Sequence, residues 1–235
     1  MDFGKAFTFV FDDESWITKL LIGGVLLFIP IIGWMALLGW MLEIGRRVLR
    51  GDAELLPDWN DFGTYLVRGL KGTIINLIYY LPYILLSGCS YGVSFWTANS
   101  TLSSGVETIA NFISLSASCI NFVYSLFVAF LIPAALMRFT MHDDDIAAGL
   151  AFGKVIGLVK DNLSTYLIVF LGSIVVSFII PLGLLAVCVG ILITFPYGAA
   201  VMGHLYGQSY AEATGTSLAT GTPPAAPAAS ADWEG

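Results

Sequence analysis

The sequence predicts an all-α, polytopic membrane protein with five to six transmembrane or re-entrant segments and amphipathic helices at the cytoplasmic membrane interface. Two observations lead to this fold class. Of the 235 residues, 57% are hydrophobic and 11% are charged, whereas about 25% of an ordinary soluble domain is charged. The charged residues also fall in short blocks between long uncharged runs. Such runs are typical of segments that lie in lipid.

The first apolar segment covers about residues 17–42. One straight helix of that length would measure about 39 Å, enough to cross a hydrocarbon core of ~30 Å with some tilt. Pro30 and Gly33 interrupt the run, however, and proline removes a backbone donor and clashes with the preceding helical turn. The segment is therefore either one kinked span or a hairpin that dips into the bilayer, and the sequence leaves both open.

A polar block from Glu43 to Lys71 separates this segment from the next. Within the block, Pro57 and Asp58 have the character of a turn that starts a helix, because proline fixes φ and aspartate caps helix N-termini. The residues that follow, about 59–70, carry aromatic and aliphatic side chains at helical spacing with charges elsewhere on the wheel. This pattern predicts an amphipathic helix at the membrane interface.

Two further apolar segments, about residues 73–96 and 109–137, are joined by small residues whose single charge is Glu107. Each is long enough to cross the bilayer, so they predict a pair of spans closed by a short loop. A second polar block then leads into about residues 146–161, in which Phe152, Ile156 and Val159 recur on one side. This segment is predicted to be a second interfacial helix, capped by Asp145.

The last apolar stretch is too long for one crossing and predicts a hairpin with arms at about residues 163–186 and 190–207. Its turn lies either at Pro181 to Gly183 or at 187–190, and the second position is favoured because it leaves the first arm long enough to cross. Residues 1–208 thus form one membrane domain. Residues 209–235, rich in Ala, Pro, Thr and Ser, predict a disordered tail.

Basic residues set the expected topology. They concentrate in the block from Glu43 to Lys71 and in the block from Arg138 to Lys160, and they are missing from the linker around residues 97–107. The positive-inside rule places both blocks, and with them the tail, in the cytoplasm of a cell whose plasma membrane the chain crosses several times. Weak internal repetition favours an N-terminus on the same side, as the hairpin alternative for residues 17–42 requires.

Several short stretches are specific enough to suggest a family. The most distinctive is Leu-Pro-Asp-Trp-Asn-Asp-Phe at Leu56 to Phe62; the others are Phe9 to Asp13, Trp16, Lys19 to Gly23, Ile29 and Pro30, Gly39, Arg46, Gly69 to Lys71, Phe195 to Tyr197, and His204 to Tyr206. Together they resemble the domain of unknown function 4013 family of prokaryotic polytopic membrane proteins. The likeness covers most of the chain except the tail. It implies a membrane protein without an assigned activity, so no residue role follows from it.

The sequence yields no catalytic, cofactor-binding or metal-binding residue. The cluster from His142 to Asp145 is the nearest to a metal site, but consecutive side chains cannot converge on one ion, and a solvated loop explains them. His204 has no carboxylate or second histidine beside it in sequence, which is typical of an interfacial histidine. Glu43, Arg46 and Arg47 share a helix face and predict a salt-bridged anchor.

Two functions fit these features. The leading hypothesis is a non-enzymatic scaffold, or a lipid- or protein-interacting component, with the bilayer, another envelope protein or a second copy of the chain as partners. The alternative is a small-solute transporter or channel, because prolines at positions 30, 82, 133, 181 and 196 interrupt nearly every apolar run. No cofactor is expected, and the net charge of -7 argues against a nucleic-acid partner.

Overall fold

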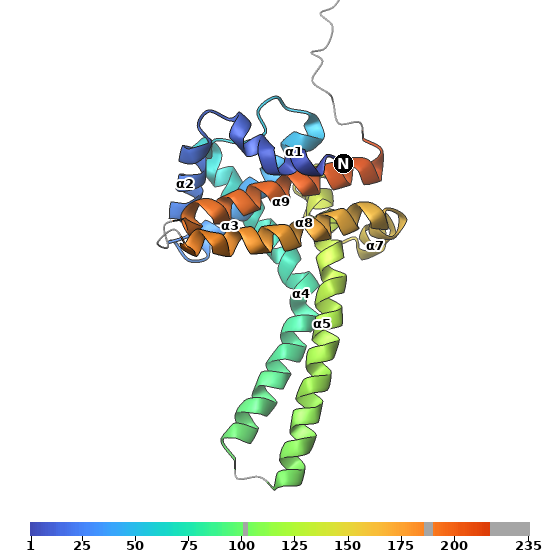
Figure 1. Cartoon of the computed structure of the whole chain (residues 1–235). Helices are drawn as coiled ribbons and strands as arrows, with labels where there is room; N and C mark the ends of the chain where they lie inside the picture. The colour runs from blue at the N-terminus through green and yellow to red at the C-terminus, as the bar shows by residue number, and fades with distance from the viewer. Residues whose placement is uncertain (101–102, 186–189, 217–235) are drawn as a thin grey trace, which may run out of the picture.

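The computed structural model describes residues 1–100, 103–185 and 190–216, and these are helical without a strand among them, which confirms the all-α prediction. Figure 1 shows two parts: a layer that contains α2, α3, α8 and α9, and a hairpin of α4 and α5 that projects far beyond it. The main helices are α2 (Trp16–Leu26), α3 (Ile32–Arg50), α4 (Phe62–Ala98), α5 (Ser104–Met141), α8 (Leu163–Leu182) and α9 (Ile191–Thr214).

The first apolar segment forms two helices, so the kinked-span alternative is wrong. The chain turns between α2 and α3, where Pro30 ends the helical hydrogen bonding and Ile31 adopts a positive φ of 69°. The turn is tight because Gly33 lies against the backbone of Leu26; an added Cβ would stand 1.8 Å from the Leu26 oxygen. Before it, a short helix α1 (Phe3–Thr8) and a 3₁₀ turn η1 (Phe9–Asp12) lie over α9 (Figure 1).

The helix predicted at 59–70 is not a separate element. A 3₁₀ turn η2 (Trp59–Asp61) runs directly into α4, so that the predicted interfacial helix and the span at 73–96 are one continuous helix, Trp59–Ala98. The sequence contains no proline between Leu70 and Thr73, and Gly72 packs between Leu38 and Leu42 of α3. The polar residues Arg68 and Lys71, which set the predicted boundary, are bound inside the fold by Asp144.

Three helices among the described residues are long and apolar enough to cross a membrane: Trp59–Ala98, Ser104–Met141 and Leu163–Leu185. With 37 and 38 residues, α4 and α5 each measure about 56 Å, well beyond a hydrocarbon core of ~30 Å. The base of the hairpin is therefore free to pack within the layer while its outer part stands clear (Figure 1). The buried residues of α5 accordingly concentrate between Val128 and Thr140.

The helix predicted at 146–161 is broken into α6 (Ile146–Gly149) and α7 (Phe152–Asp161). Asp145 caps α6 as predicted, since its Oδ1 accepts a hydrogen bond from the Ala147 amide at 3.0 Å. In α7, Val155 and Val159 are buried against the rest of the fold, whereas Phe152 and Ile156 are exposed. Gly149, the last residue of α6, fits closely against Ile75 and Phe139.

The C-terminal stretch forms the predicted pair of helices, α8 and α9, with a 3₁₀ turn η3 (Gly183–Leu185) after α8. The favoured turn position, 187–190, falls almost entirely on residues 186–189, which lie outside the described residues. The predicted start of the tail at residue 209 is wrong, because α9 continues to Thr214 and buries Ser209, Tyr210 and Ala211. Residues 217–235 of the predicted tail also lie outside the described part.

Glycines allow α9 to lie at the centre of the layer. An added Cβ on Gly203 would stand 2.3 Å from the Met41 oxygen of α3, and one on Gly207 would stand 2.5 Å from the Gly45 oxygen. The two helix backbones are therefore in contact, as small residues permit. The largest core cluster surrounds this crossing and the base of α5, with Leu42, Leu136, Met137, Phe139, Tyr166 and Tyr210 among its members.

Candidate functional site

A clasp around Lys19 joins the N-terminal helices to the start of α4. The Lys19 ammonium lies 2.6 Å from Asp13 Oδ2 and 3.0 Å from Asp58 Oδ1, and it donates a hydrogen bond to the Leu56 carbonyl at 2.9 Å. Trp59 donates from its indole to the Lys19 carbonyl at 2.8 Å. The stretch from Leu56, which is the most distinctive part of the family resemblance, thus meets Asp13 and Lys19, two other residues that contribute to it.

Aromatic packing supports this clasp from the side of α3. The Trp40 and Trp59 rings stack with centroids 5.4 Å apart and planes 7° apart. Trp40 donates from its indole to the Pro57 carbonyl at 2.9 Å, and Tyr65 donates from its hydroxyl to the Asp58 carbonyl at 2.9 Å. These bonds satisfy the carbonyls of a segment that has no regular secondary structure of its own.

The clasp shifts the ionisation of its charged groups. Desolvation by burial lowers the pKa of Lys19, but its hydrogen bonds to Asp13 and Asp58 outweigh burial and hold that pKa above its usual value. Burial likewise raises the pKa of Asp13, but bonds from Lys19 and Ser15 bring it below its usual value. Both groups are therefore charged throughout the physiological range, and the clasp is a structural ion pair.

A second ionic junction centres on Arg68 of α4, which is 2% exposed. Its Nε donates to Asp144 Oδ1 at 2.9 Å, and its Nη1 donates to Glu43 Oε2. Lys71 adds a bond from its ammonium to the Asp144 carbonyl at 3.1 Å. The junction ties α3, α4 and the loop before α6 together. Because Arg68 is so deeply buried, both carboxylates are needed to compensate its desolvation.

The predicted anchor of Glu43, Arg46 and Arg47 is part of this junction. Arg46 Nε lies 3.4 Å from Glu43 Oε2, and Arg47 Nε lies 3.5 Å from Glu43 Oε1. The closer partner of Glu43 is Arg68, which sequence reasoning missed because the two residues stand 25 positions apart on different helices. The periodicity of a sequence indicates which residues share a face of one helix, and it does not indicate contacts between residues of different helices.

The side chains of the cluster from His142 to Asp145 make separate interactions and do not converge on one point. Asp144 pairs with Arg68, Asp145 caps α6, and the His142 Nδ1 lies 2.8 Å from the Arg138 carbonyl. Among the described residues no group of three or more His, Cys, Asp or Glu side chains has the geometry of a metal site.

His204 lies in α9, outside the three long apolar helices, and is 2% exposed. Its ring stacks on Phe9 with centroids 4.6 Å apart, and its Nδ1 is buried without a hydrogen-bond partner among the described residues. Desolvation by burial, aided by the positive charge of Lys5, lowers the pKa of His204 to about 4. The ring is therefore neutral at physiological pH and serves as a packing group in the layer.

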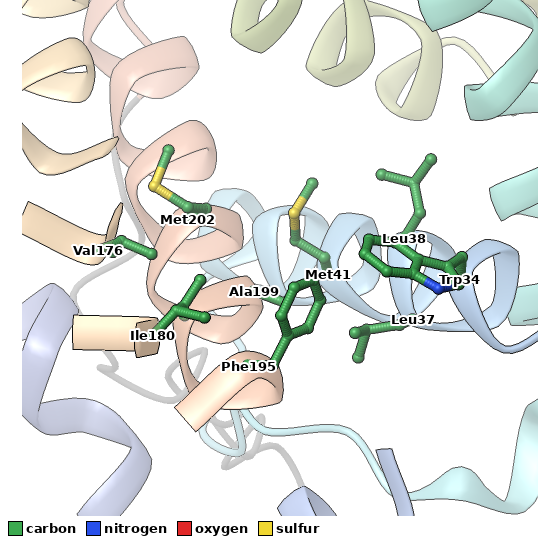
Figure 2. A pocket seen from close by; sticks show the side chains of 10 residues that line it. Trp34, Leu37, Leu38, Met41, Val176, Ile180, Phe195, Ala199 and Met202 are labelled. Carbon is green, nitrogen blue, oxygen red and sulfur yellow. The ribbon is translucent and has the colours of Figure 1, made fainter. Parts of the chain in front are cut away.

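An apolar pocket of about 260 Å³ opens between α3, α8 and α9. Figure 2 shows Trp34, Leu38 and Met41 of α3 along one side, with residues of α8 and α9 opposite. The complete lining is Trp34, Leu37, Leu38, Met41, Val176, Ile180, Phe195, Gly198, Ala199 and Met202. Every one of these side chains is aliphatic, aromatic, methionine or glycine, so the pocket suits a hydrocarbon ligand.

A polar groove of about 330 Å³ lies between the outer parts of α4 and α5. It is lined by hydroxyl groups, aromatic rings and one amide, from Tyr83, Ser87, Ser90, Tyr91, Ser94, Ser114, Ser118, Asn121, Phe122 and Ser125. Asn121 bonds across the hairpin, donating from Nδ2 to Ser87 Oγ at 2.8 Å. The side chains of Asn76 and Ser118 instead donate to carbonyls of their own helices.

Comparison with known proteins agrees with the resemblance in the sequence. A family model described as "Protein of unknown function (DUF4013)" matches residues 22–189, which is more than half of the chain. No curated protein and no solved structure matched significantly. The matched region runs from within α2 past the end of α8, so it includes the α4–α5 hairpin and the Arg68 junction. The chain therefore belongs to the DUF4013 family.

Proposed function

We propose that this chain is a non-enzymatic integral membrane protein of the plasma membrane that binds lipid and acts as a scaffold for other membrane components. The observation that carries the proposal is the apolar pocket between α3, α8 and α9 (Figure 2). It occurs in a molecule with three helices long and apolar enough to cross a membrane. In a bilayer, the acyl chain of a phospholipid is the abundant ligand that matches such a lining.

The use of the charged residues supports a scaffold over an enzyme. Lys19 and Arg68, which are both buried, are each held by two carboxylates that come from other segments of the chain. Groups bound in this way fix the mutual positions of helices and are costly to remove from their partners. A rigid layer with an acyl-chain pocket is the arrangement that a lipid-binding scaffold requires.

Photo-crosslinking tests lipid binding directly. The purified protein is reconstituted in vesicles that contain a phospholipid with a diazirine near the middle of one acyl chain, then irradiated and digested. We expect adducts on the α3 peptide that contains Trp34 to Met41 and on the α9 peptide that contains Ala199. Adducts spread evenly over all lipid-facing helices, with no enrichment at these peptides, would contradict the proposal.

Two variants, each with one alanine replaced by leucine, make this test more specific. Ala199→Leu places three extra carbon atoms in the pocket and is expected to reduce the adducts on α3. Ala98→Leu makes the same change at the exposed end of α4, outside the pocket, and is expected to leave them unchanged. An equal effect of both variants would show that the adducts report general contact with lipid.

The polar groove between α4 and α5 supports a second candidate, a small-solute transporter or channel. The groove begins at Tyr83, next to Pro82, so hydroxyl groups line an opening beside a proline within a helix. Flux measurements in vesicles over a panel of ions and small neutral solutes test this function. Transport that Ser90→Leu abolishes would favour the transporter, and absence of flux for every solute would remove it.

A further inference from the structure

The guanidinium of Arg46 is poorly compensated within the Arg68 junction. Its Nε lies 3.4 Å from Glu43 Oε2 but is buried without a hydrogen bond to any described residue. Glu43 accepts a hydrogen bond from Arg68 instead, and Arg68 Nε also donates to both oxygens of Asp144, at 2.9 and 3.0 Å. The two carboxylates of the junction are therefore used by Arg68, and Arg46 keeps most of its capacity to donate.

The junction as a whole carries an excess of positive charge. In the part of the chain that the structure describes, Glu43 and Asp144 are the only carboxylates within ion-pair distance of its basic side chains. Those basic side chains are Arg46, Arg47, Arg68 and Lys71. Burial and the positive charge of Arg68 outweigh the carboxylates and lower the pKa of Arg46. An anion beside Arg46 would therefore offset a charge that the chain leaves unbalanced.

Arg46 is also open to a ligand, which Arg68 is not. The Arg46 side chain is 23% exposed and that of Arg68 is 2% exposed. Nε is the enclosed nitrogen of the Arg46 guanidinium, so the terminal Nη1 and Nη2 are the donors that a ligand meets. Arg50 lies one turn further along α3, is exposed, and forms no ion pair with a described residue. Two neighbouring guanidinium groups with free donors match the oxygen atoms of a phosphate.

The place of Arg46 in the proposed topology indicates where such a phosphate comes from. Its neighbours Arg68 and Asp144 belong to the base of the α4–α5 hairpin, near the start of α4 and just after the end of α5. Because basic residues concentrate around this base, it is the cytoplasmic end of the spanning hairpin. The headgroups of inner-leaflet lipids lie at this depth, and many of them are anionic.

We propose that Arg46 and Arg50 form a binding site for a phosphate group, which in the membrane is the headgroup phosphate of an anionic phospholipid. The inference rests on the proposed function and adds a headgroup site to the acyl-chain pocket. The terminal nitrogens of both guanidinium groups donate to the phosphate oxygens. Since Arg68 already holds both carboxylates of the junction, the phosphate removes no partner from the fold.

Native mass spectrometry tests the site, because it identifies bound lipids by mass. The wild type is released from micelles that contain equal amounts of phosphatidylglycerol, which has a net negative charge, and phosphatidylcholine, which has none. We expect preferential retention of phosphatidylglycerol. Arg46→Gln is expected to weaken its binding about fivefold, the effect of one basic side chain at a membrane surface. Arg50→Gln, at the exposed end of α3, is expected to act in the same direction without disturbing the junction.

Lys154→Gln is the matched control. Lys154 is exposed on α7 in the second basic block, so its loss changes the net charge equally and leaves the arginine pair intact. We expect unchanged retention of phosphatidylglycerol. Equal weakening by Arg46→Gln and Lys154→Gln would overturn the proposal. Equal retention of the two lipids by the wild type, or full retention of phosphatidylglycerol in both arginine variants, would overturn it as well.

Inorganic phosphate distinguishes the two sources of the ligand. Excess phosphate in the same buffer is expected to leave phosphatidylglycerol bound, because the lipid also contacts apolar surface of the protein. Displacement of the lipid by phosphate from the wild type, together with weaker phosphate binding in Arg46→Gln, would support the arginine site and overturn a lipid as its occupant.

Acyl-chain photo-crosslinking separates this proposal from the proposed function. Adducts at the α3 pocket in a protein without a preference for phosphatidylglycerol would overturn the headgroup site alone and leave lipid binding intact. A preference that depends on Arg46, in a protein without those adducts, would support the headgroup site and remove the pocket as the lipid-binding element.

Discussion

Lys19 joins the N-terminal helices to the segment that leads into α4. Its side chain is 9% exposed, and its ammonium contacts Asp13 on one side and Asp58 and the Leu56 carbonyl of a second segment on the other. Lys19→Met keeps the aliphatic stem and removes the charge, so the partly buried Asp13 and the Leu56 carbonyl lose their donor. We expect a loss of about 2–4 kcal/mol in the free energy of unfolding, measured by denaturant titration in detergent micelles.

Lys5 provides the matched control for that substitution. Its ion pair with Asp12 is solvent-exposed, with side chains 50% and 63% exposed. Lys5→Met is expected to change the unfolding free energy by less than about 0.5 kcal/mol, because exposed ion pairs are screened and entropically costly. Similar losses for both variants would show that the clasp adds no more stability than a surface pair.

His204 predicts a pH dependence of stability. Burial lowers its pKa from 6.5 to about 4 in the folded protein, so the unfolded chain binds a proton at a higher pH than the folded chain does. Stability from this residue is fully present above pH 6.5 and is lost as the pH falls through that value toward 4. The melting temperature of the wild type should therefore decline over this range more steeply than that of His204→Gln.

The comparison with His204→Gln removes contributions from other groups. Carboxylates with lowered pKa values, such as Asp13 and Glu212, also lose stability toward acid, but they do so in both proteins. Parallel curves for the two proteins between about pH 7 and pH 4 would rule out His204 as a source of the acid sensitivity.

At the scale of elements, direct backbone contact between α3 and α4 requires glycine. An added Cβ on Gly39 would stand 1.8 Å from the Tyr65 oxygen, and one on Gly69 would stand 1.6 Å from the Met35 oxygen. Gly39→Ala must therefore push the helices apart and is expected to cost about 1–3 kcal/mol or more of unfolding free energy. Thermal unfolding in detergent measures this loss.

Gly63 is the control for that change. It lies in the first turn of α4, and a Cβ added there would have no atom within 4 Å. Gly63→Ala is expected to be neutral or to stabilise the protein by up to about 1 kcal/mol, as alanine has the higher helix propensity. If Gly39→Ala were equally well tolerated, the close crossing of α3 and α4 would be contradicted.

The helix boundaries also show which features the sequence patterns could predict and which they could not. Local chemistry predicted the break at Pro30 and the cap at Asp145, because both depend on residues next to them in the chain. The boundary predicted near residue 70, between an interfacial helix and a membrane span, was wrong. It treated Arg68 as an exposed charge, whereas Arg68 is buried and paired with Glu43 and Asp144. The end of α9 was misjudged for the same reason: Ser209 looks like tail composition until its packing partners are known.

The candidate sites were still less accessible to sequence reasoning. The residues of the Lys19 clasp were recognised as distinctive, but only as signs of a family. The apolar pocket draws on α3, α8 and α9, and the polar groove on two helices of a hairpin, so each depends on contacts between segments distant in sequence. The regular spacing of polar residues along each of the two helices was the sequence signal that could have indicated the groove.

At the scale of the whole molecule, the two parts present apolar surface in different directions. The α4–α5 hairpin projects from the layer, while α8 runs across it (Figure 1). The turn after α2 and the end of α8 both lie beside the start of α9, as contacts of Gly24 with Leu192 and of Gly183 with Gly190 show. Phe28, Ile31 and Leu185 at this edge are 72%, 68% and 82% exposed. The hairpin thus suits a full crossing, and the edge of the layer suits partial insertion.

Accessibility to a membrane-impermeant maleimide tests this arrangement in cells. The test uses a variant in which the three cysteines, Cys89, Cys119 and Cys188, are replaced by alanine. A single cysteine introduced at Asn99, directly after α4, is expected to react from outside, because the adjacent linker carries no basic residue. A cysteine at Asp52, in the basic block after α3, is expected to react only after permeabilisation. One at Phe28 is expected to resist labelling from both sides, since it is inserted without crossing. If the cysteines at positions 99 and 52 were labelled from the same side, a hairpin that spans the bilayer would be contradicted. Ready labelling of the cysteine at position 28 would contradict insertion of the layer edge and would leave the spanning hairpin unaffected.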